Sequence, residues 1–341
     1  VDSTETTTMD VSDDAREIVG YPEILVNRER VVIERGLNKH GVDDPHALSE
    51  EEGDIAGEKA FALEVNYEIS RDDGVYIRKK GDGQVGLIRR EKLPLSLGSL
   101  TSHYAVVPVT AKHNLVRRTD NGVIKNVKDV YMGLMNEKRE DIKLEFRDSN
   151  WEHTAADTRI LRRAESEDVS WEYGVDVAVG KKISGVLEGV TNVDYSFELV
   201  RQDFVCEKGV HVGIAVFQSS APTNKTVSRN PERPVKISQE KLEKIYGKPQ
   251  EINIYTGTIT FADPEQLHIE YDINSFTGCS GAIVFLLDKD QPKSVTQGDH
   301  GKAIAVHAGG HPTLRNRNLG FKLTEEMLVV ADVANLRLDA Q

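Results

Sequence analysis

Residues 275–282 read SFTGCSGA, and no other segment of this chain constrains its chemistry as strongly. Ser280 lies between Gly278 and Gly281 in a Gly-x-Ser-Gly pattern. A serine hydroxyl is a weak nucleophile, so an enzyme that uses one exposes it on a tight turn within reach of a base. The same turn directs backbone N–H groups at the oxygen that becomes negative in the transition state. The glycines supply the backbone freedom for such a turn, and the expected oxyanion donors are the N–H groups of Gly278 and Ser280.

A second segment lies downstream, where residues 301–310 read GKAIAVHAGG. Its apolar residues predict a strand that reaches His307 and ends in Gly309 and Gly310. Two glycines here allow an extended peptide to approach closely and pair as an added strand. Four-residue patterns such as Gly-x-Ser-Gly also occur by chance in ordinary turns, so the case depends on the residues upstream.

A catalytic serine needs a histidine base, and the histidine needs a carboxylate that holds its tautomer. The run YAVVPVTAKHN over residues 104–114 predicts a strand that delivers His113. Asp176 stands in the apolar run GVDVAVGK over residues 174–181, where an unpaired charge is costly to bury. The alternatives are a loop histidine at 113, an ordinary turn serine at 280, and an Asp176 that pairs with a lysine at 181 or 182.

These motifs, in the chain order His, Asp, Ser, resemble those of the trypsin- and chymotrypsin-like (PA clan) serine proteases. The resemblance implies that His113 is the general base, that Asp176 orients it, and that Ser280 is the nucleophile. It predicts an enzyme that cleaves peptide bonds through an acyl-enzyme. A competing hypothesis is a latent or inactive protease-like module that binds a peptide or protein partner. A third is a protease regulated by its N-terminal extension.

The segment 301–310, continued by NLGFKL at 318–323, is most similar to the corresponding segments of glutamyl endopeptidases and picornavirus-type main proteases. This resemblance implies that His307 and Ser275 contact the substrate side chain before the scissile bond, and that Gly309 and Gly310 bind the substrate backbone. It predicts cleavage after Glu or Gln. The charges of His311, Arg315 and Arg317 either add to this pocket or are solvated loop charges.

Cys279 is an alternative nucleophile, because cysteine is the more reactive side chain at neutral pH. Viral members of the resembling group usually carry cysteine at the catalytic position. The Gly-x-nucleophile-Gly register nevertheless favours Ser280 and leaves Cys279 in the x position. Cysteine there also argues against the zymogen activation of trypsin, in which an aspartate at this position pairs with a new N-terminal amine.

The amino-acid composition limits the kinds of partner and the location that we expect for this protein. The 341 residues contain 43 basic and 56 acidic side chains, a net charge of −13 that argues against nucleic acid as a partner. No apolar stretch predicts a membrane span, no signal-peptide pattern is present, and no histidine spacing indicates a metal site. The two cysteines favour a reducing compartment, so the expected location is cytoplasmic. We expect a protein or peptide substrate, no cofactor and no metal.

The pattern of short runs predicts an all-β fold, a chymotrypsin-like double β-barrel with a C-terminal helix and an N-terminal extension. Residues 1–74 form the predicted extension, partly disordered and able to dock a regulatory partner. Residues 75–182 form the first barrel, which carries His113 and Asp176. Residues 183–341 form the second barrel, which carries Ser280 and the specificity pocket. The main predicted strands are 75–79, 104–111, 210–217, 252–261, 267–273, 282–287 and 302–308, and the predicted helices are 239–246 and 325–336.

Overall fold

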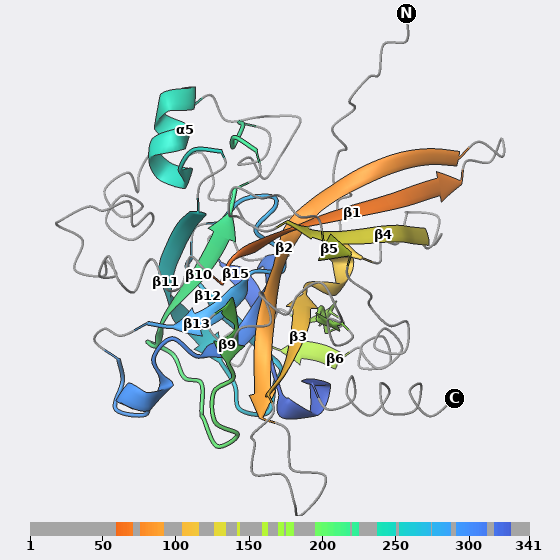
Figure 1. Cartoon of the computed structure of the whole chain (residues 1–341). Helices are drawn as coiled ribbons and strands as arrows, with labels where there is room; N and C mark the ends of the chain where they lie inside the picture. Colours follow the sequence, from red (N-terminus) through yellow and green to blue (C-terminus); the bar gives the residue numbers. More distant parts are fainter. Residues whose placement is uncertain are drawn as a thin grey trace, which may run out of the picture.

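Two β-structures make up the fold, and the segments that carry the candidate site meet between them (Figure 1). The computed structural model describes residues 59–70, 76–91, 104–115, 126–133, 142–143, 159–162, 170–173, 175–180, 195–218, 220–224, 237–249, 252–273, 275–287, 291–311 and 317–328. Strands dominate this part of the chain, which confirms the predicted all-β class. Residues 1–58 of the predicted extension lie outside the described residues.

The C-terminal half forms a closed antiparallel barrel in the order β10-β11-β12-β15-β14-β13. Five of its six strands confirm runs predicted from the sequence, with ends that differ by a few residues, and the sixth, β15, was not among the predicted strands. They are β10 (His211–Phe217), β11 (Ile252–Ala262), β12 (His268–Tyr271), β13 (Ile283–Leu286), β14 (Ala303–Gly310) and β15 (Asn318–Lys322). Inward-facing residues of these strands, among them Val212, Ile214 and Tyr271, form the barrel core.

The N-terminal half forms a seven-stranded sheet in the order β5-β4-β1-β2-β3-β8, with β9 parallel to β2. The strands are β1 (Phe61–Ser70), β2 (Tyr76–Glu91), β3 (Tyr104–Thr110), β4 (Asn126–Gly133), β5 (Ile142–Lys143), β8 (Ala178–Val179) and β9 (Phe197–Glu198). A separate hairpin joins β6 (Arg159–Arg162) to β7 (Ser170–Tyr173).

Strand β1 lies N-terminal to residue 75, where the sequence predicted the first barrel to begin. It pairs with β2 along its whole length and with β4 on its other edge. Phe61, Leu63 and Val65 alternate along it and are buried, and this period of two is the signal for a half-buried strand. Residues 61–70 are therefore part of the sheet and not of a separate extension.

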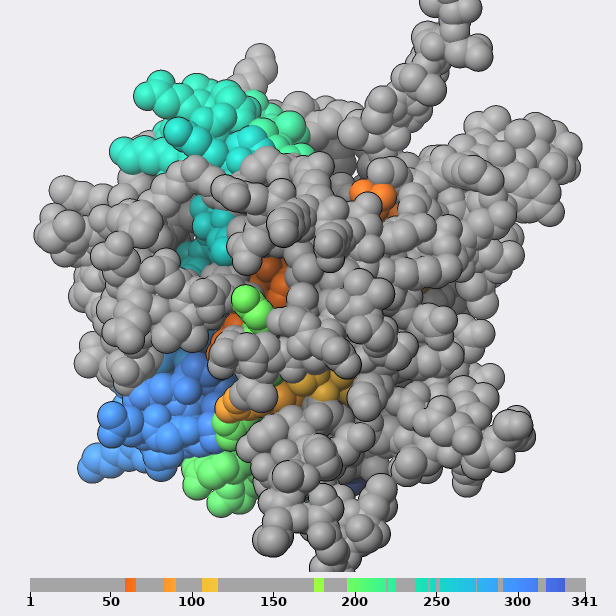
Figure 2. Space-filling model, in the orientation of Figure 1, coloured from red at the N-terminus to blue at the C-terminus, as the bar shows by residue number. Residues whose placement is uncertain are grey.

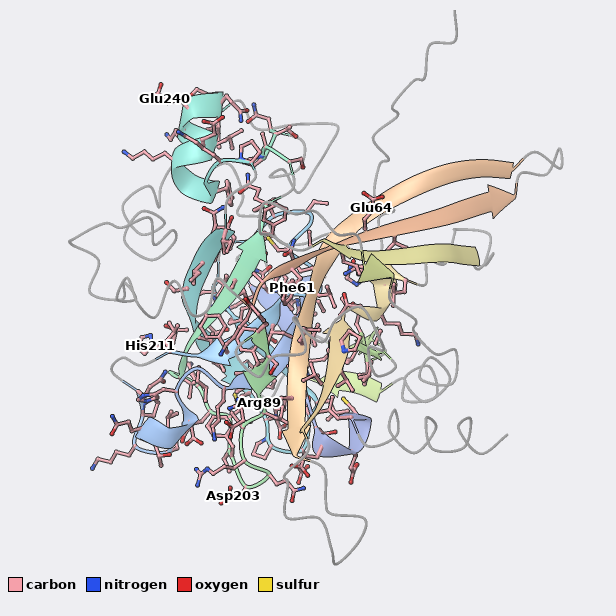
Figure 3. The ribbon with its side chains drawn as sticks, in the orientation of Figure 1. Phe61, Glu64, Arg89, Asp203, His211 and Glu240 are labelled. Carbon is pink, nitrogen blue, oxygen red and sulfur yellow. The ribbon has the colours of Figure 1, made fainter. Side chains whose placement is uncertain are left out.

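A second apolar cluster joins the sheet to the barrel. Val107 and Val109 of β3 belong to the same buried cluster as Ile283, Phe285 and Val306 of the barrel. Strand β10 contributes to both cores, because its interior positions are buried on both faces. Figure 3 shows Phe61 where β1 meets the barrel. The shared core holds the two halves in one arrangement.

Polar contacts on the surface join the halves as well. Arg89 of β2 forms an ion pair with Glu198 of β9 at 2.7 Å, and Lys302 beside β14 pairs with the same carboxylate at 2.9 Å. Arg89 is labelled in Figure 3. These hydrogen bonds and charges outweigh the opposing effect of burial and lower the pKa of Glu198.

Two helical segments accompany the barrel. Helix α5 (Gln239–Tyr246) coincides with the predicted helix, with Ser238 as N-cap and Gly247 as C-cap. It packs Leu242 and Tyr246 into the barrel core and exposes its charged face at one end of the molecule (Figure 2). Residues 325–328 are helical, and Thr324 accepts a hydrogen bond from the backbone N–H of Met327, as expected for its predicted N-cap role. The rest of that predicted helix lies outside the described residues.

Candidate active site

His113 lies in a short 3₁₀ turn, Lys112–Asn114, that follows β3. Its backbone N–H donates to Oδ1 of Asp176 at 2.8 Å, and its ring Nδ1 lies 2.5 Å from Oδ2 of the same carboxylate. Two oxygens of one side chain thus hold both the backbone and the ring of His113. A carboxylate on Nδ1 requires a proton there and leaves Nε2 as the nitrogen available for proton transfer.

Asp176 is 6% exposed and lies between the buried side chains of Val175 and Val177. It lies two residues before β8, which pairs with β3 through Val109 and Val179. This pairing places the carboxylate next to the turn that follows β3. The buried charge therefore has His113 as its partner. The alternative partners Lys181 and Lys182 lie outside the described residues.

The segment before Ser280 forms a tight turn. The N–H of Cys279 donates to the carbonyl oxygen of Phe276 at 3.1 Å, and Gly278 has a φ of +106°. A four-residue turn with positive φ at its third position has the geometry of a type II turn, which glycine adopts most easily. The glycine predicted from the sequence thus has the conformation that the turn requires.

A second turn of the same kind follows at once. The N–H of Ala282 donates to the carbonyl oxygen of Cys279 at 3.1 Å, and Gly281 has a φ of +94°. A Cβ atom at position 281 would lie 2.1 Å from the carbonyl oxygen of Gln84 and 2.3 Å from the hydroxyl of Thr110. Both the backbone conformation and the space therefore demand glycine. The two turns share Cys279, and Ser280 is the second residue of the second turn.

Gln84 of β2 connects the first half of the molecule to this double turn. Its backbone N–H donates to the carbonyl oxygen of Ser280 at 2.8 Å, and its side-chain Nε2 donates to that of Gly278 at 3.0 Å. The same carboxamide exchanges two hydrogen bonds with the backbone of Phe217, both at 2.9 Å. The side chain is 3% exposed, so these bonds are shielded from water.

Asn114 makes the connection from the histidine side. It follows His113 directly, and its side-chain Nδ2 donates to the carbonyl oxygen of Ser280 at 2.9 Å and to the hydroxyl of Thr110 at 3.0 Å. Thr110 in turn donates to the carbonyl oxygen of Gln84 at 2.6 Å. The neighbour of the predicted base is thus bonded to the backbone of the predicted nucleophile.

The Ser280 side chain is buried, and its Oγ lies 3.4 Å from the carbonyl oxygen of Ala308 on β14. Cys279 is also buried, and no disulfide bond joins it to Cys206. Burial raises the pKa of the Cys206 thiol to about 12.

His307 lies beside the double turn and is fully buried. Its backbone N–H donates to the carbonyl oxygen of Ala282, and its own carbonyl accepts from the N–H of Gly281, both at 2.8 Å. Its ring Nδ1 lies 2.7 Å from the hydroxyl of Tyr271, which also donates to the carbonyl oxygen of Leu319 at 3.0 Å. The ring is therefore held in one orientation.

Ser275, Gly309 and Gly310 lie around the same turn and strand. Ser275 is fully buried, and its hydroxyl has no hydrogen-bond partner in the part of the chain that the structure describes. Gly309 and Gly310 pair with β15, after an irregularity in register that begins at His307. The structure thus brings every predicted site residue to one region around the double turn, which joins both halves of the molecule.

His311 does not lie in a solvated loop, which was one of the two alternatives that the sequence left open for it. It is buried, and its Nε2 lies 3.5 Å from a carboxylate oxygen of Glu270, which is equally buried. The backbone N–H of His311 donates a hydrogen bond to the backbone carbonyl oxygen of Arg317. Arg315 lies outside the described residues. His311 is therefore not a solvated loop charge.

Gln84, Asn114, Thr110 and Tyr271 were not predicted from the sequence as parts of the site. Asn114 is adjacent to His113 and Thr110 lies in the quoted run before it, which is a weak signal. Gln84 lies far in sequence from every motif, and Tyr271 lies four residues before the segment 275–282, so both reach the site through strand pairing.

Within the described residues no group of three or more His, Cys, Asp or Glu side chains is arranged to hold a metal ion. The same residues include no helix with the length and apolar character needed to cross a bilayer.

No protein-family description and no curated protein matches this sequence. Among solved structures, the protease Anisep from Arthrobacter nicotinovorans is similar at 11% identity and a TM-score of 0.44, over 81% of this chain and 96% of that one. A thermostable serine protease from an extremophilic microorganism is similar at 14% identity and a TM-score of 0.41, over 83% and 98%. The tobacco vein mottling virus protease is similar at 9% identity and a TM-score of 0.38, over 81% and 82%. All three of these structures are proteases.

Proposed function

We propose that this protein is a serine endopeptidase in which His113, Asp176 and Ser280 act together. The observation that carries the proposal is the two-point contact of Asp176 with His113, at 2.8 Å to its N–H and 2.5 Å to its ring. A surface histidine has no need of a buried carboxylate that holds both its backbone and its ring. The hydrogen bond from Asn114 to Ser280 supports the placement of the nucleophile beside this pair.

In the proposed reaction, Ser280 Oγ attacks the carbonyl carbon of the scissile bond while its proton passes to Nε2 of His113. The tetrahedral intermediate collapses when His113 gives this proton to the leaving amine, which releases the first product and leaves an ester on Ser280. Water then attacks the ester, with His113 again as base, and the second product leaves with a new carboxyl group. Asp176 stabilises the protonated ring in both steps.

The N–H groups of Gly278 and Ser280 are the proposed oxyanion donors. The type II geometry at Gly278 supports this role, because it sets the orientation of the peptide that carries the Gly278 N–H. The bonds from Gln84 to the carbonyl oxygens of Gly278 and Ser280 hold the turn in that shape. Preorganised donors of this kind need no rearrangement when charge develops.

Ser275 and His307 are proposed to select the residue before the scissile bond, with Gly309 and Gly310 pairing to the substrate backbone. The single proton of the Tyr271 hydroxyl is donated to Leu319, so the contact of Tyr271 with His307 requires a proton on Nδ1. A neutral ring then offers Nε2 as an acceptor, which suits the amide N–H of Gln. A protonated ring offers Nε2–H as a donor, which suits the carboxylate of Glu. We therefore propose cleavage after both residues.

Labelling with a fluorophosphonate probe tests the proposal. The wild-type chain is expected to form one covalent adduct on Ser280, and Ser280→Ala is expected to form none while keeping its circular dichroism spectrum. Cys279→Ala is the matched control, because it changes the neighbouring candidate nucleophile in the same turn and should leave labelling intact. A folded wild-type chain that is not labelled, or labelling that persists in Ser280→Ala, would overturn the proposal in favour of a binding module.

A further inference from the structure

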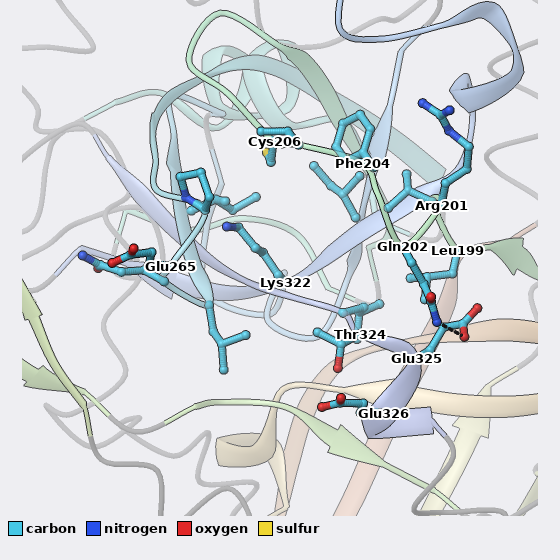
Figure 4. Close-up of a pocket in the computed structure, with 18 residues that line it drawn as sticks. Leu199, Arg201, Gln202, Phe204, Cys206, Glu265, Lys322, Thr324, Glu325 and Glu326 are labelled. Carbon is cyan, nitrogen blue, oxygen red and sulfur yellow. Dashed lines mark hydrogen bonds between the residues drawn. The ribbon is translucent and has the colours of Figure 1, made fainter.

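A cavity lies against the core of the barrel, beside residues of β12, β14 and β15, and none of the candidate catalytic or substrate-binding residues lines it. Its volume is about 450 Å³. Three segments enclose it, namely residues 199–206, residues 264–269 and residues 322–326, together with Ile304 (Figure 4). A cavity of this size falls in the range of small-molecule sites, about 300 to 1,000 Å³.

The lining is mostly apolar. Leu199, Phe204, Leu267, Ile269 and Ile304 contribute to its surface. Ile269 and Ile304 are almost completely buried, so they form a fixed floor. Val205, in the segment at the edge, is 52% exposed, which is unusual for a large apolar side chain in the described part of this protein. An apolar ligand body would gain by covering these groups.

Lys322 places a positive charge in this apolar surrounding. Its side chain extends into the space between Cys206 and Glu265 (Figure 4). Its Nζ donates to the carbonyl oxygen of Asp263 at 2.6 Å, and no carboxylate among the described residues lies within ion-pair distance of it. An ammonium group carries three protons, so two donors remain for another partner. A half-buried cation without a counter-ion is costly, and an anion that entered the cavity would remove that cost.

Cys206 does not supply the missing negative charge. Its thiol lines the same cavity, but burial raises its pKa to about 12, so it is protonated at neutral pH. Burial lowers the pKa of Lys322, and the negative charge of Asp263 offsets this effect only in part. Within the cavity the cation faces a neutral thiol and aliphatic side chains.

The other charges of the cavity lie at its rim. Glu265, Glu325 and Glu326 are exposed, and Glu325 accepts a hydrogen bond from Gln202 at 2.6 Å (Figure 4). Arg201 is already paired with the buried carboxylate of Asp299 at 3.1 Å. Exposed charges are screened by water and salt, whereas the charge of Lys322 acts within the cavity. Lys322 is thus the group that decides which charge a bound ligand carries.

We infer that this cavity binds a small monocarboxylic acid with an aliphatic tail. The carboxylate accepts hydrogen bonds from Nζ of Lys322, and the tail lies against Phe204, Ile269 and Ile304. The inference does not depend on peptidase activity, because the cavity shares no residue with the candidate active site.

Calorimetric titration of the full chain with octanoate tests this inference. 1-Octanol and octylamine serve as probes of the same tail length that are neutral and positively charged. We expect octanoate to bind at least about tenfold more tightly than either, since a hydrogen bond to a charged group is worth roughly that factor. Equal binding of octanoate and octanol, tighter binding of octylamine, or no binding of octanoate would each overturn the inference.

Variants at position 322 locate the site. Lys322→Met keeps a long unbranched side chain but removes the charge, so it should lose the preference for octanoate over octanol. Lys322→Arg keeps the charge and should retain the preference. Lys322→Gln provides a second neutral variant if Lys322→Met does not fold. An unchanged preference in a folded neutral variant would show that octanoate binds elsewhere and would overturn the inference. Fluorophosphonate labelling of the same variants should remain at the wild-type level, which separates this result from that of the proposed function.

Discussion

The side-chain amide of Gln84 donates a hydrogen bond to the carbonyl oxygen of Gly278 at 3.0 Å. Gln84 belongs to a strand of the N-terminal sheet, and Gly278 belongs to the turn of the barrel that carries the proposed nucleophile. The conformation of that turn therefore depends on how the two halves of the molecule pack. A change at Gln84 tests this dependence without altering any group proposed to touch the substrate.

Gln84→Met is expected to lower kcat roughly tenfold to hundredfold with little change in KM, because a small displacement of the turn misaligns the nucleophile. The variant keeps the length of the side chain but loses its hydrogen bonds to Gly278 and Phe217. The unsatisfied buried groups should also reduce the free energy of unfolding by about 3 kcal/mol. Gln218→Met is the matched control, since Gln218 is equally buried but bonds Gly247 and Asn253. Wild-type kcat in Gln84→Met would show that the turn keeps its shape without this side chain.

Asp176→Asn is expected to reduce kcat by a factor on the order of 10⁴, the loss that follows when a triad carboxylate is replaced by an amide. The amide cannot accept from both the backbone and the ring of His113 and still stabilise the protonated ring. Asp299→Asn is a suitable control, because Asp299 is a buried carboxylate that pairs with Arg201 and Thr296. It should lower stability and leave kcat unchanged. A loss of only a few-fold in Asp176→Asn would assign the orienting role to another group.

His307→Ala is expected to reduce kcat/KM roughly tenfold more for peptides with Glu or Gln before the scissile bond than for a peptide with Leu there, because His307 is proposed to hydrogen-bond the carboxylate or amide of that residue. The measurement compares kcat/KM for three peptides that differ only at this residue. Equal losses for all three peptides would remove His307 from the pocket.

Stability is expected to fall as the pH is lowered from about 6.5 to about 4, with His268 as one source. Burial lowers the pKa of His268 to about 4, and the nearby charge of Glu270 only partly offsets this. The unfolded chain therefore binds a proton near pH 6.5 that the folded chain does not bind until about pH 4, so protons favour unfolding in this range. The loss amounts to about 3 kcal/mol at most. His268→Gln should flatten the curve of unfolding free energy against pH in urea titrations, and an unchanged curve would assign the effect to other groups.

Local sequence patterns predict most strands of the barrel. The runs around Ile214, Ile254 and Val306 are apolar and β-branched, and their strands lie where the sequence predicts them. The same holds for helix α5, whose N-cap and C-terminal glycine are adjacent signals. Strand β1 was not predicted, because its alternation of apolar and polar residues is short and because the charge-rich residues around it indicated an extension.

The proposal of His113, Asp176 and Ser280 as catalytic residues could be made from the sequence, because each residue stands within a short motif whose chemistry needs that residue type. The turn around Ser280 is likewise local, since Gly278 and Gly281 are the residues that accept its positive φ angles. Residues whose role depends on contacts with distant parts of the chain have no such signal in the sequence around them. Gln84 reaches Gly278 across 194 positions of the chain. Lys322 lies in the cavity, bonded to the carbonyl oxygen of Asp263 and with no carboxylate of the described residues in ion-pair contact, only because of where β15 packs. Strand pairing and the packing of the two halves create these relationships, because the energy of a hydrogen bond or a charge depends on the three-dimensional surroundings and not on neighbours in sequence.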